Sequence, residues 1–253
     1  MGNLSHRFFE MLFKEEDIQT WDKQQVEDWI EQRSRRLLAR EGAVLLMYGR
    51  EPEKIAFLNR VKYAAWSLVS MIHSNNWKVW KTELPLAGKF IDIPIKGKAD
   101  LVLIRGEELA VIDFKWRGAT RRRNMIKNEE DLQLVTYSKL LTDDDRSTHT
   151  AYFILENGKM IARNNEAFKE AESVAPDVNH LEVNDRIYDR MQTTYQWRMA
   201  QLQKGQIEIR TIQTLPDLED IYGDELLTVL EMKRENAHFD DYRTLITGMK
   251  KED

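Results

Sequence analysis

The apolar positions of the chain follow a helical period first and a strand period later. They recur at helical spacing over residues 3–14, 20–40 and 52–73, which predicts three amphipathic helices. Pro52 suits the first turn of the third of these helices. We therefore expect the chain to begin with a helical region.

The apolar period changes to two after these helices. Alternating residues over 77–84 and 90–95 predict two strands, with Pro85 near the end of the first. Two further apolar runs, residues 101–104 and 109–112, are joined by a polar tetrapeptide that contains glycine. This pattern predicts a β-hairpin.

The predicted hairpin brings two carboxylates side by side. If its turn centres between Gly106 and Glu107, antiparallel pairing places Asp100 opposite Asp113. Lys115 lies two residues beyond Asp113 and therefore shares its face of the strand. Like charges directly opposite one another destabilise a sheet. A divalent cation held by oxygen ligands is the simplest way to offset that repulsion.

A basic segment follows the hairpin. Residues 116–123 predict a loop that contains four arginines: Arg117, Arg121, Arg122 and Arg123. The pattern next predicts a helix over residues 128–141, in which Gln133 and Tyr137 are four positions apart and project from one face.

The remainder of the chain predicts fewer elements. We expect strands over residues 150–155 and 160–163 to pair through a turn, and a helix over residues 186–204. The whole chain is interpreted as one domain, residues 1–253, with three parts: a helical N-terminal part (1–75), a catalytic sheet core (76–165), and C-terminal helices with a tail (166–253).

Composition limits the class of protein. Hydrophobic residues make up 42% of the 253 residues and charged residues 32%, as in soluble globular proteins. No apolar run reaches the roughly 18 residues that span a bilayer, so we expect no membrane association. The absence of cysteine excludes disulfides and iron-sulfur clusters, and fits a cytoplasmic protein. The net charge of −5 weighs against a nucleic-acid partner, but the basic segment supplies a local positive cluster.

Five sequence features occur together in one order, which resembles the RecB-like branch of the PD-(D/E)XK nuclease superfamily. They are G-x-x-x-H (Gly2 to His6), a glutamate on the first strand (Glu83), G-x-x-D (Gly97 to Asp100), D-x-K (Asp113 to Lys115) and Q-x-x-x-Y (Gln133 to Tyr137). A lone D-x-K carries little weight. The full order, together with the independent pairing of Asp100 and Asp113, carries much more. The motifs span residues 2–137, about half the chain.

The resemblance implies a fold and a context. The expected fold is α/β and restriction-endonuclease-like: a mixed β-sheet flanked by α-helices, with the N-terminal helices on one side. Many relatives are nuclease parts of helicase-nucleases, so the chain is interpreted as a domain excised from a longer protein. It lacks the P-loop pattern of an ATPase motor.

The resemblance also implies a metal site. His6, Asp100, Asp113 and the backbone carbonyl of Phe114 would hold Mg²⁺ or Mn²⁺, and the histidine shifts the preference towards manganese. Such an ion neutralises a phosphate and lowers the pKa of bound water. Lys115 would orient the attacking water or stabilise the developing negative charge.

The other motif residues have supporting roles by the same resemblance. Glu83 would bind a second metal or a metal-bound water, and Gln133 and Tyr137 would act near the metal or the DNA backbone. The four arginines would contact phosphates without reading sequence. Each role has a structural alternative: a locally hydrogen-bonded His6, a Lys115 that only neutralises the aspartates, or polar side chains that face solvent.

These features lead to three functional hypotheses. The leading one is a metal-dependent deoxyribonuclease, the nuclease part of an AddB- or RecB-like helicase-nuclease in double-strand-break repair, with DNA and a helicase outside this chain as partners. The second is a stand-alone exonuclease similar to those of CRISPR adaptation, which the absence of cysteine weighs against. The third is a non-catalytic DNA-binding or scaffold module, which the intact set of Asp100, Asp113 and Lys115 weighs against.

Overall fold

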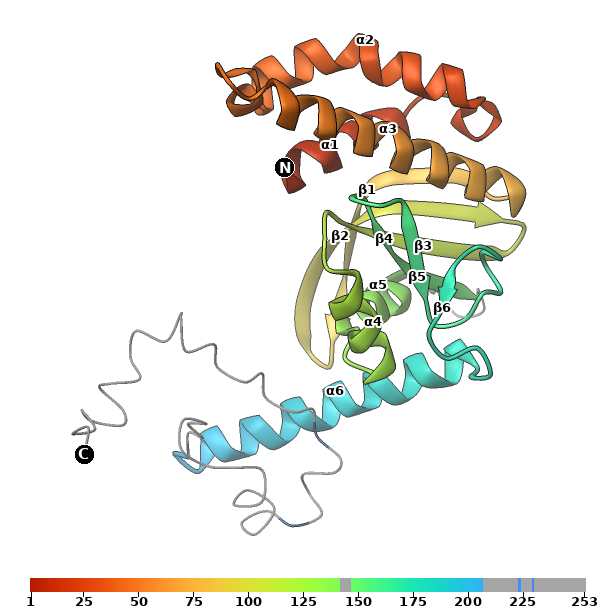
Figure 1. Ribbon diagram of the computed structural model, residues 1–253. Helices are drawn as coiled ribbons and strands as arrows, with labels where there is room; N and C mark the ends of the chain where they lie inside the picture. Colours follow the sequence, from red (N-terminus) through yellow and green to blue (C-terminus); the bar gives the residue numbers. More distant parts are fainter. Residues whose placement is uncertain (142–146, 207–222, 224–228, 230–253) are drawn as a thin grey trace, which may run out of the picture. The chain divides into compact units, whose positions relative to one another are not determined.

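The structure is a computed structural model that describes residues 1–141, 147–206, 223 and 229 (Figure 1). The chain divides into two compact units, Met1–Asp185 and Arg186–Asp253. The first unit holds a sheet, the helices on its two faces and all the predicted site residues. Beyond residue 206, the predicted tail lies outside the described residues apart from positions 223 and 229.

Three helices begin the chain, as predicted: α1 (Gly2–Leu12), α2 (Lys23–Glu41) and α3 (Glu51–Ser74). Short 3-10 turns over Ile18–Thr20 and Ala43–Leu46 connect them. α2 begins at a capping box, in which the Asp22 carboxylate accepts the Gln25 N–H at 2.9 Å and the Gln25 side chain accepts the Asp22 N–H at 2.8 Å.

Six strands form one mixed sheet in the order β1-β2-β3-β4-β5-β6. They are β1 (Lys78–Phe90), β2 (Ile93–Arg105), β3 (Glu108–Lys115), β4 (Thr148–Ile154), β5 (Lys159–Ala162) and β6 (Glu172–Ser173). The pairs β3–β4 and β5–β6 are parallel, and the other three pairs are antiparallel.

The prediction of two short strands before the hairpin is wrong in length. Each is one end of a longer strand, and β1 and β2 form a long hairpin that turns at Ile91 and Asp92. β1 continues through Pro85, and it is an edge strand of the sheet, the place in a sheet where proline is tolerated.

The register between β2 and β3 confirms the predicted hairpin. Leu101 pairs with Ile112 and Ile104 pairs with Leu109. One position beyond the first of these pairs, Asp100 lies opposite Asp113, as the turn at Gly106 requires.

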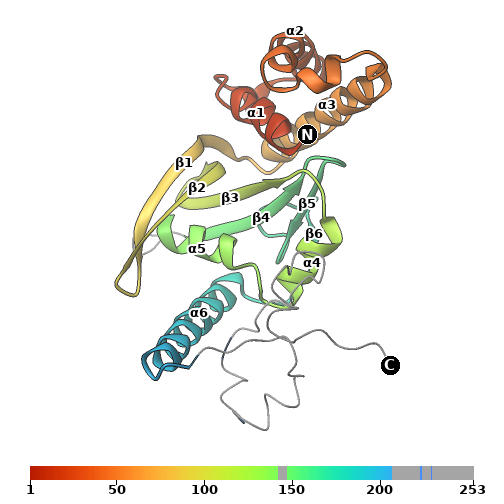
Figure 2. The same cartoon turned by 90° about the vertical axis from the view of Figure 1, so that its left-hand side faces the viewer.

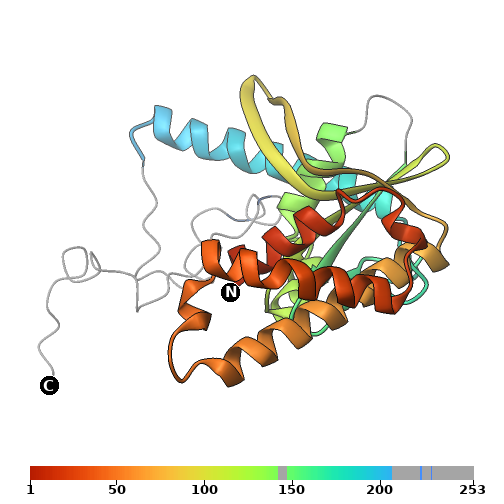
Figure 3. The same cartoon turned by 90° about the horizontal axis from the view of Figure 1, so that it is seen from above.

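The first three helices cover one face of the sheet, which confirms the predicted placement (Figures 2 and 3). Leu103, Ile112 and Phe153 of the sheet join this core with Phe9 of α1 and Leu68 of α3. The opposite face of the sheet carries two shorter helices, α4 (Ala119–Lys127) and α5 (Leu132–Leu141), in two further apolar clusters. The fold is thus a mixed α/β sheet flanked by helices, consistent with a restriction-endonuclease-like fold.

The prediction of a loop over residues 116–123 is wrong for most of its length. Gly118, at φ 99°, precedes α4, which contains three of the four arginines. Ile126 is the one fully buried residue of this helix, so its sequence carries almost no apolar period from which a helix could be recognised.

The last described helix is α6 (His180–Gln203), which begins earlier than predicted. Its first turn belongs to the first compact unit. Within the described part of the chain, no helix is long and apolar enough to cross a membrane.

Candidate active site

The predicted ligand groups of His6, Asp100 and Phe114 meet at one point. His6 Nε2 lies 2.9 Å from the carbonyl oxygen of Phe114 and 3.6 Å from Asp100 Oδ2. Asp100 Oδ2 accepts the backbone N–H of Phe114 at 2.7 Å. An imidazole from α1, a carboxylate from β2 and a backbone carbonyl from β3 are therefore gathered from three separate elements.

The packing of α1 fixes His6 in this position. The ring of Phe9 meets the ring of Phe114 edge-on, with centroids 5.2 Å apart, and Phe8 and Leu12 are buried beside it. The same residue, Phe114, thus anchors the helix by its side chain and faces His6 by its carbonyl. His6 Nδ1 lies 2.8 Å from the carbonyl oxygen of Gly2, one turn earlier.

The His6 ring carries a proton on each nitrogen in this arrangement, because both nitrogens face carbonyl oxygens, which only accept hydrogen bonds. Burial opposes the positive charge. The interactions with Asp100 and with the two carbonyls outweigh burial and raise the pKa of His6 to about 9.

Asp113 is a buried carboxylate beside a cation. Its side chain is 2% exposed, and Lys115 Nζ lies 2.5 Å from its Oδ2. Among the described residues, Oδ2 finds no hydrogen-bond partner of normal geometry despite this ion pair. Burial raises the pKa of Asp113, the Lys115 ammonium opposes that rise, and the charge of Asp100 adds to it. A buried oxygen in this state suits a metal ion.

Glu83 is held in a strained backbone conformation next to this site. Its neighbours Thr82 and Leu84 pair with Leu101 and Ala99, which places Glu83 opposite Asp100. Its φ of 51° lies in the left-handed region, which costs a non-glycine residue about 1–3 kcal/mol. The carboxylate forms an ion pair with Lys98. Strain of this kind is often found at functional sites.

The Q-x-x-x-Y motif of α5 contacts the glycine of the G-x-x-D motif on β2. Gln133 Nε2 donates to Tyr137 Oη at 2.8 Å, which confirms that both side chains lie on one face of α5. The Tyr137 ring rests on Gly97, where an added Cβ would lie 2.8 Å from Cε1 of the ring. The glycine is therefore required for α5 to pack closely on β2.

A family model described as the PD-(D/E)XK nuclease superfamily matches residues 1–214. The chain belongs to this superfamily. The match includes every predicted site residue, but the model describes the superfamily as a whole, so the RecB-like branch stays a prediction. Among the curated proteins, none matches the chain significantly.

The four arginines predicted to contact DNA differ in their ion pairs and in their burial. Arg117 Nε lies 3.0 Å from Glu156, and Arg123 forms an ion pair with Glu172. Arg121 is exposed, and no described residue forms an ion pair with it. Two of the positive charges are therefore already matched by carboxylates of the same chain.

Arg122 turns inward. Its guanidinium lies over the ring of Tyr152, 5.2 Å from the centroid, and Nη1 donates to Met125 Sδ at 3.2 Å. Its buried Nε has no hydrogen-bond partner within the described residues. Its charge also lowers the pKa of Asp113 against the larger effect of burial. Of the four arginines, Arg122 is thus the one coupled to the buried carboxylate.

Tyr152 is a neighbour of the site that sequence reasoning missed. The parallel pairing of β3 and β4 places it beside Asp113. Burial and the carboxylates of Asp131 and Asp113 raise the pKa of its hydroxyl, and the nearby Arg122 opposes that rise. Its only sequence signal is a tyrosine on an apolar strand. The partner strand cannot be read from the sequence, because β3 and β4 are separated by two helices.

Three other side chains form a group of metal-ligand type within residues 1–141 and 147–206: His149, Glu166 and His180. Each offers one ligand atom, and these atoms lie within 4.8 Å of one another. The predicted set of His6, Asp100 and Asp113 forms no such group among these residues. Its Asp113 carboxylate lies against Lys115 instead.

Proposed function

We propose that this chain hydrolyses phosphodiester bonds of DNA with Mg²⁺ or Mn²⁺. The observation that carries the proposal is the meeting of His6, Asp100 and the Phe114 carbonyl beside the buried pair of Asp113 and Lys115. Membership of a nuclease superfamily supports it independently. Members of this superfamily use divalent metals.

The residues present fit a divalent ion. Asp100, Asp113 and the Phe114 carbonyl offer hard oxygen ligands, and His6 would offer one nitrogen once Nε2 gives up its proton. This donor set suits manganese somewhat better than magnesium. When bound, the ion would neutralise a phosphate oxygen and acidify a water molecule. The buried Asp113 carboxylate, which already lies against the Lys115 ammonium, supports a site for positive charge here.

Lys115 supplies the charge next to the reacting phosphate in this proposal. The Lys115 side chain stands on the same face as Asp113 and is 23% exposed, and its ammonium contacts the buried carboxylate. A compact cation in that place orients an attacking water and stabilises the negative charge that develops on the phosphate. In this proposal Glu83, which lies opposite Asp100, holds a second ion or a water molecule.

The remaining residues bind and position DNA in this proposal. Arg122 carries a half-buried charge close to Asp113 and is the best placed of the four arginines to contact a phosphate at the reacting centre. Arg121 is exposed and suits contact with a neighbouring phosphate. Gln133 and Tyr137 support β2 and thereby the position of Asp100.

The motif order extends the proposal to a biological role. We propose that the chain is the nuclease part of a RecB-like helicase-nuclease in double-strand-break repair, acting in the cytoplasm with a helicase that this chain does not contain. The motifs G-x-x-x-H, G-x-x-D, D-x-K and Q-x-x-x-Y support this role by resemblance.

Degradation of linear single- and double-stranded DNA tests the proposed chemistry. Wild-type protein with Mn²⁺ or Mg²⁺ should degrade DNA, and a chelator should stop it. Asp113→Asn and Lys115→Gln should each lower the rate at least about 100-fold, the scale for removing a charged group that acts in the transition state. Asp92→Asn and Lys89→Gln change exposed residues of the β1–β2 hairpin and should leave the rate unchanged.

Two results would contradict the proposal. One is DNA degradation that continues in the chelator. The other is equal activity of Asp113→Asn and its control Asp92→Asn, because the buried carboxylate would then have no part in the reaction.

A further inference from the structure

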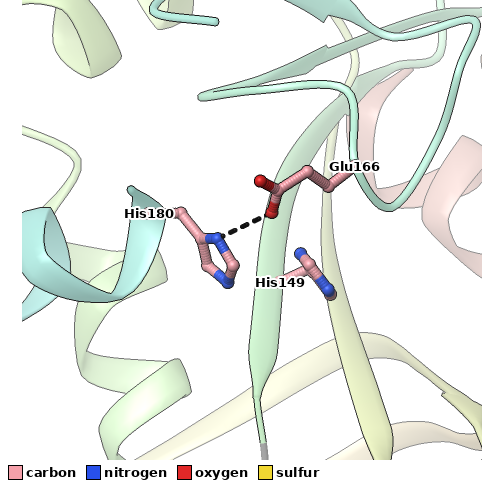
Figure 4. A group of neighbouring side chains, drawn as sticks. All are labelled: His149, Glu166 and His180. Atoms are coloured by element: carbon pink, nitrogen blue, oxygen red, sulfur yellow. Dashed lines mark ion pairs between the residues drawn. The ribbon is translucent and has the colours of Figure 1, made fainter. Parts of the chain in front are cut away.

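A second cluster of metal-ligand side chains lies outside the candidate active site (Figure 4). His149 is in β4, Glu166 is in the loop between β5 and β6, and His180 is the first residue of α6. His180 Nδ1 lies 3.1 Å from Glu166 Oε2, and the two imidazole rings stack with centroids 4.4 Å apart. All three residues belong to the first compact unit.

The cluster is separate from the active site. In the parallel pair of β3 and β4, His149 stands beside Ala110, and Tyr152 stands beside Asp113. The two positions are an odd number of residues apart, so their side chains point to opposite faces of the sheet. They are also about 10 Å apart along the strand. One ion cannot serve both groups.

Each histidine of the cluster has an outer partner. Glu108 Oε1 lies 3.3 Å from His149 Nε2, and the Ser147 hydroxyl oxygen lies 3.4 Å from His180 Nε2. The Glu108 carboxylate favours a proton on Nε2 of His149 and leaves its Nδ1 for a ligand. In His180 the proton lies on Nδ1, towards the Glu166 carboxylate, and the Ser147 hydroxyl can donate to Nε2; a bound ion would take the place of the Nδ1 proton. Figure 4 shows one ring nitrogen of each histidine on the side of the Glu166 carboxylate. Histidines that bind metals are usually oriented by an outer carboxylate or hydroxyl in this way.

The surroundings of the cluster also favour a bound ion. His149 and His180 line a small cavity of about 10 Å³, room for roughly one water molecule. Asn164 lines the same cavity, and its buried Nδ2 has no hydrogen-bond partner among the described residues. Burial lowers the pKa of both imidazoles, while Glu108 and Glu166 oppose that shift.

One positive charge beside the cavity is already compensated. Arg163 lines the cavity, but its Nη2 donates to both carboxylate oxygens of Asp131, at 2.9 and 2.7 Å. Glu166, in contrast, is 59% exposed and carries a negative charge into the cluster from the solvent side. The local charge therefore permits a cation.

We propose that His149, Glu166 and His180 bind a zinc ion that ties the β5–β6 loop and the start of α6 to β4. Two imidazoles and one carboxylate favour zinc over magnesium or calcium, which prefer oxygen ligands alone. Three protein ligands leave the fourth tetrahedral position for a water molecule. The Asn164 amide is the adjacent donor for that water.

Calorimetric titration of the metal-free full chain with zinc chloride tests the site. We expect wild type to bind one equivalent of zinc at this site. Glu166→Gln and His180→Gln should each lower the zinc affinity at least about 10-fold, because even the loss of a residue that only orients a ligand usually lowers metal affinity by that much. Glu182→Gln, an exposed carboxylate in the first turn of α6, is the matched control and should bind zinc as wild type does. His6→Gln, in the candidate active site, should also retain this equivalent.

Together, the variants show whether zinc binds at the proposed cluster or elsewhere. If Glu166→Gln and His180→Gln bind zinc as tightly as Glu182→Gln, the site is wrong. If zinc binding disappears in His6→Gln alone, the ion belongs to the candidate active site. Should His180→Gln fail to fold, Glu166→Gln still decides, because Glu166 is an exposed loop residue. Saturating zinc should also raise the Tm of wild type by about 5 °C, and that of Glu166→Gln by clearly less.

Discussion

Asp113 has the most constrained surroundings of the site residues. Its carboxylate is buried, one oxygen lacks a hydrogen bond of normal geometry, and Asp100 lies opposite on the next strand. Among the described residues, the ammonium of Lys115 forms the one ion pair of Asp113, and the guanidinium of Arg122 adds a weaker positive influence. Such an arrangement lowers the stability of the folded protein, as groups needed for catalysis often do in active sites.

Replacing this carboxylate by an amide should stabilise the metal-free protein. Because the pKa of Asp113 is raised in the folded state, the folded protein binds this proton more tightly than the unfolded chain, and ionisation costs stability. Asp113→Asn should therefore raise the free energy of unfolding in chelator by about 1 kcal/mol at pH 7. The gain should shrink as pH falls below the raised pKa of the folded state and should vanish below the ordinary value of 3.8, where the carboxyl is protonated in both states.

Urea unfolding at several pH values measures this gain. Asp92→Asn, which changes an exposed carboxylate of the same sheet, should leave stability nearly unchanged. A metal-free Asp113→Asn protein less stable than wild type at pH 7 would show that the Lys115 pair outweighs burial.

At the scale of elements, the site depends on how α1 and α5 pack against the sheet. α1 brings His6 to Asp100 through the contact of Phe9 with Phe114. α5 rests on β2 where Gly97 leaves room for the Tyr137 ring. Neither helix contributes a carboxylate to the site. α1 positions His6 beside Asp100, and α5 packs against Gly97, which lies three residues before Asp100 on β2.

Gly97→Ala should lower the free energy of unfolding by about 1–3 kcal/mol, the usual cost of overpacking. The added methyl would stand 2.8 Å from Cε1 of Tyr137, too close for any real contact. In a Tyr137→Leu background the same substitution should cost clearly less, because the ring edge is gone. An equal cost in both backgrounds, measured as a double-mutant cycle in urea, would rule out this contact as the reason for the glycine.

The sequence predicted the elements whose evidence is local. The register of the β2–β3 hairpin agrees with the prediction because a short turn at Gly106 fixes the pairing of both strands, although both strands extend beyond the predicted runs. The three N-terminal helices carry clear apolar periods and were predicted closely. The positions of Asp100 opposite Asp113 and of Gln133 beside Tyr137 follow from these local rules.

The elements that sequence reasoning missed depend on distant contacts. α4 buries one residue fully and has no readable period. The parallel pairing of β3 with β4, which brings Tyr152 to Asp113, crosses two helices. The cluster of His149, Glu166 and His180 joins a strand, a loop and a helix start, so no spacing in the sequence reveals it.

At the scale of the whole molecule, the first compact unit carries two separate candidate metal centres, which do not share a ligand. The active-site group uses oxygen ligands and one imidazole, and the cluster at His149 uses two imidazoles and one carboxylate. The two sets favour different ions, so the choice of metal distinguishes them. Catalysis is proposed for the first and a structural tie for the second.

Anomalous X-ray scattering from crystals grown with Mn²⁺ tests the central claim most directly. We expect a manganese peak bounded by His6 Nε2, Asp100, Asp113 and the Phe114 carbonyl oxygen, with Asp113 turned from Lys115 towards the ion. The same peak should be absent in crystals of Asp113→Asn. A wild-type map with no manganese at this position, at a concentration that supports DNA degradation, would contradict the assignment of the active site.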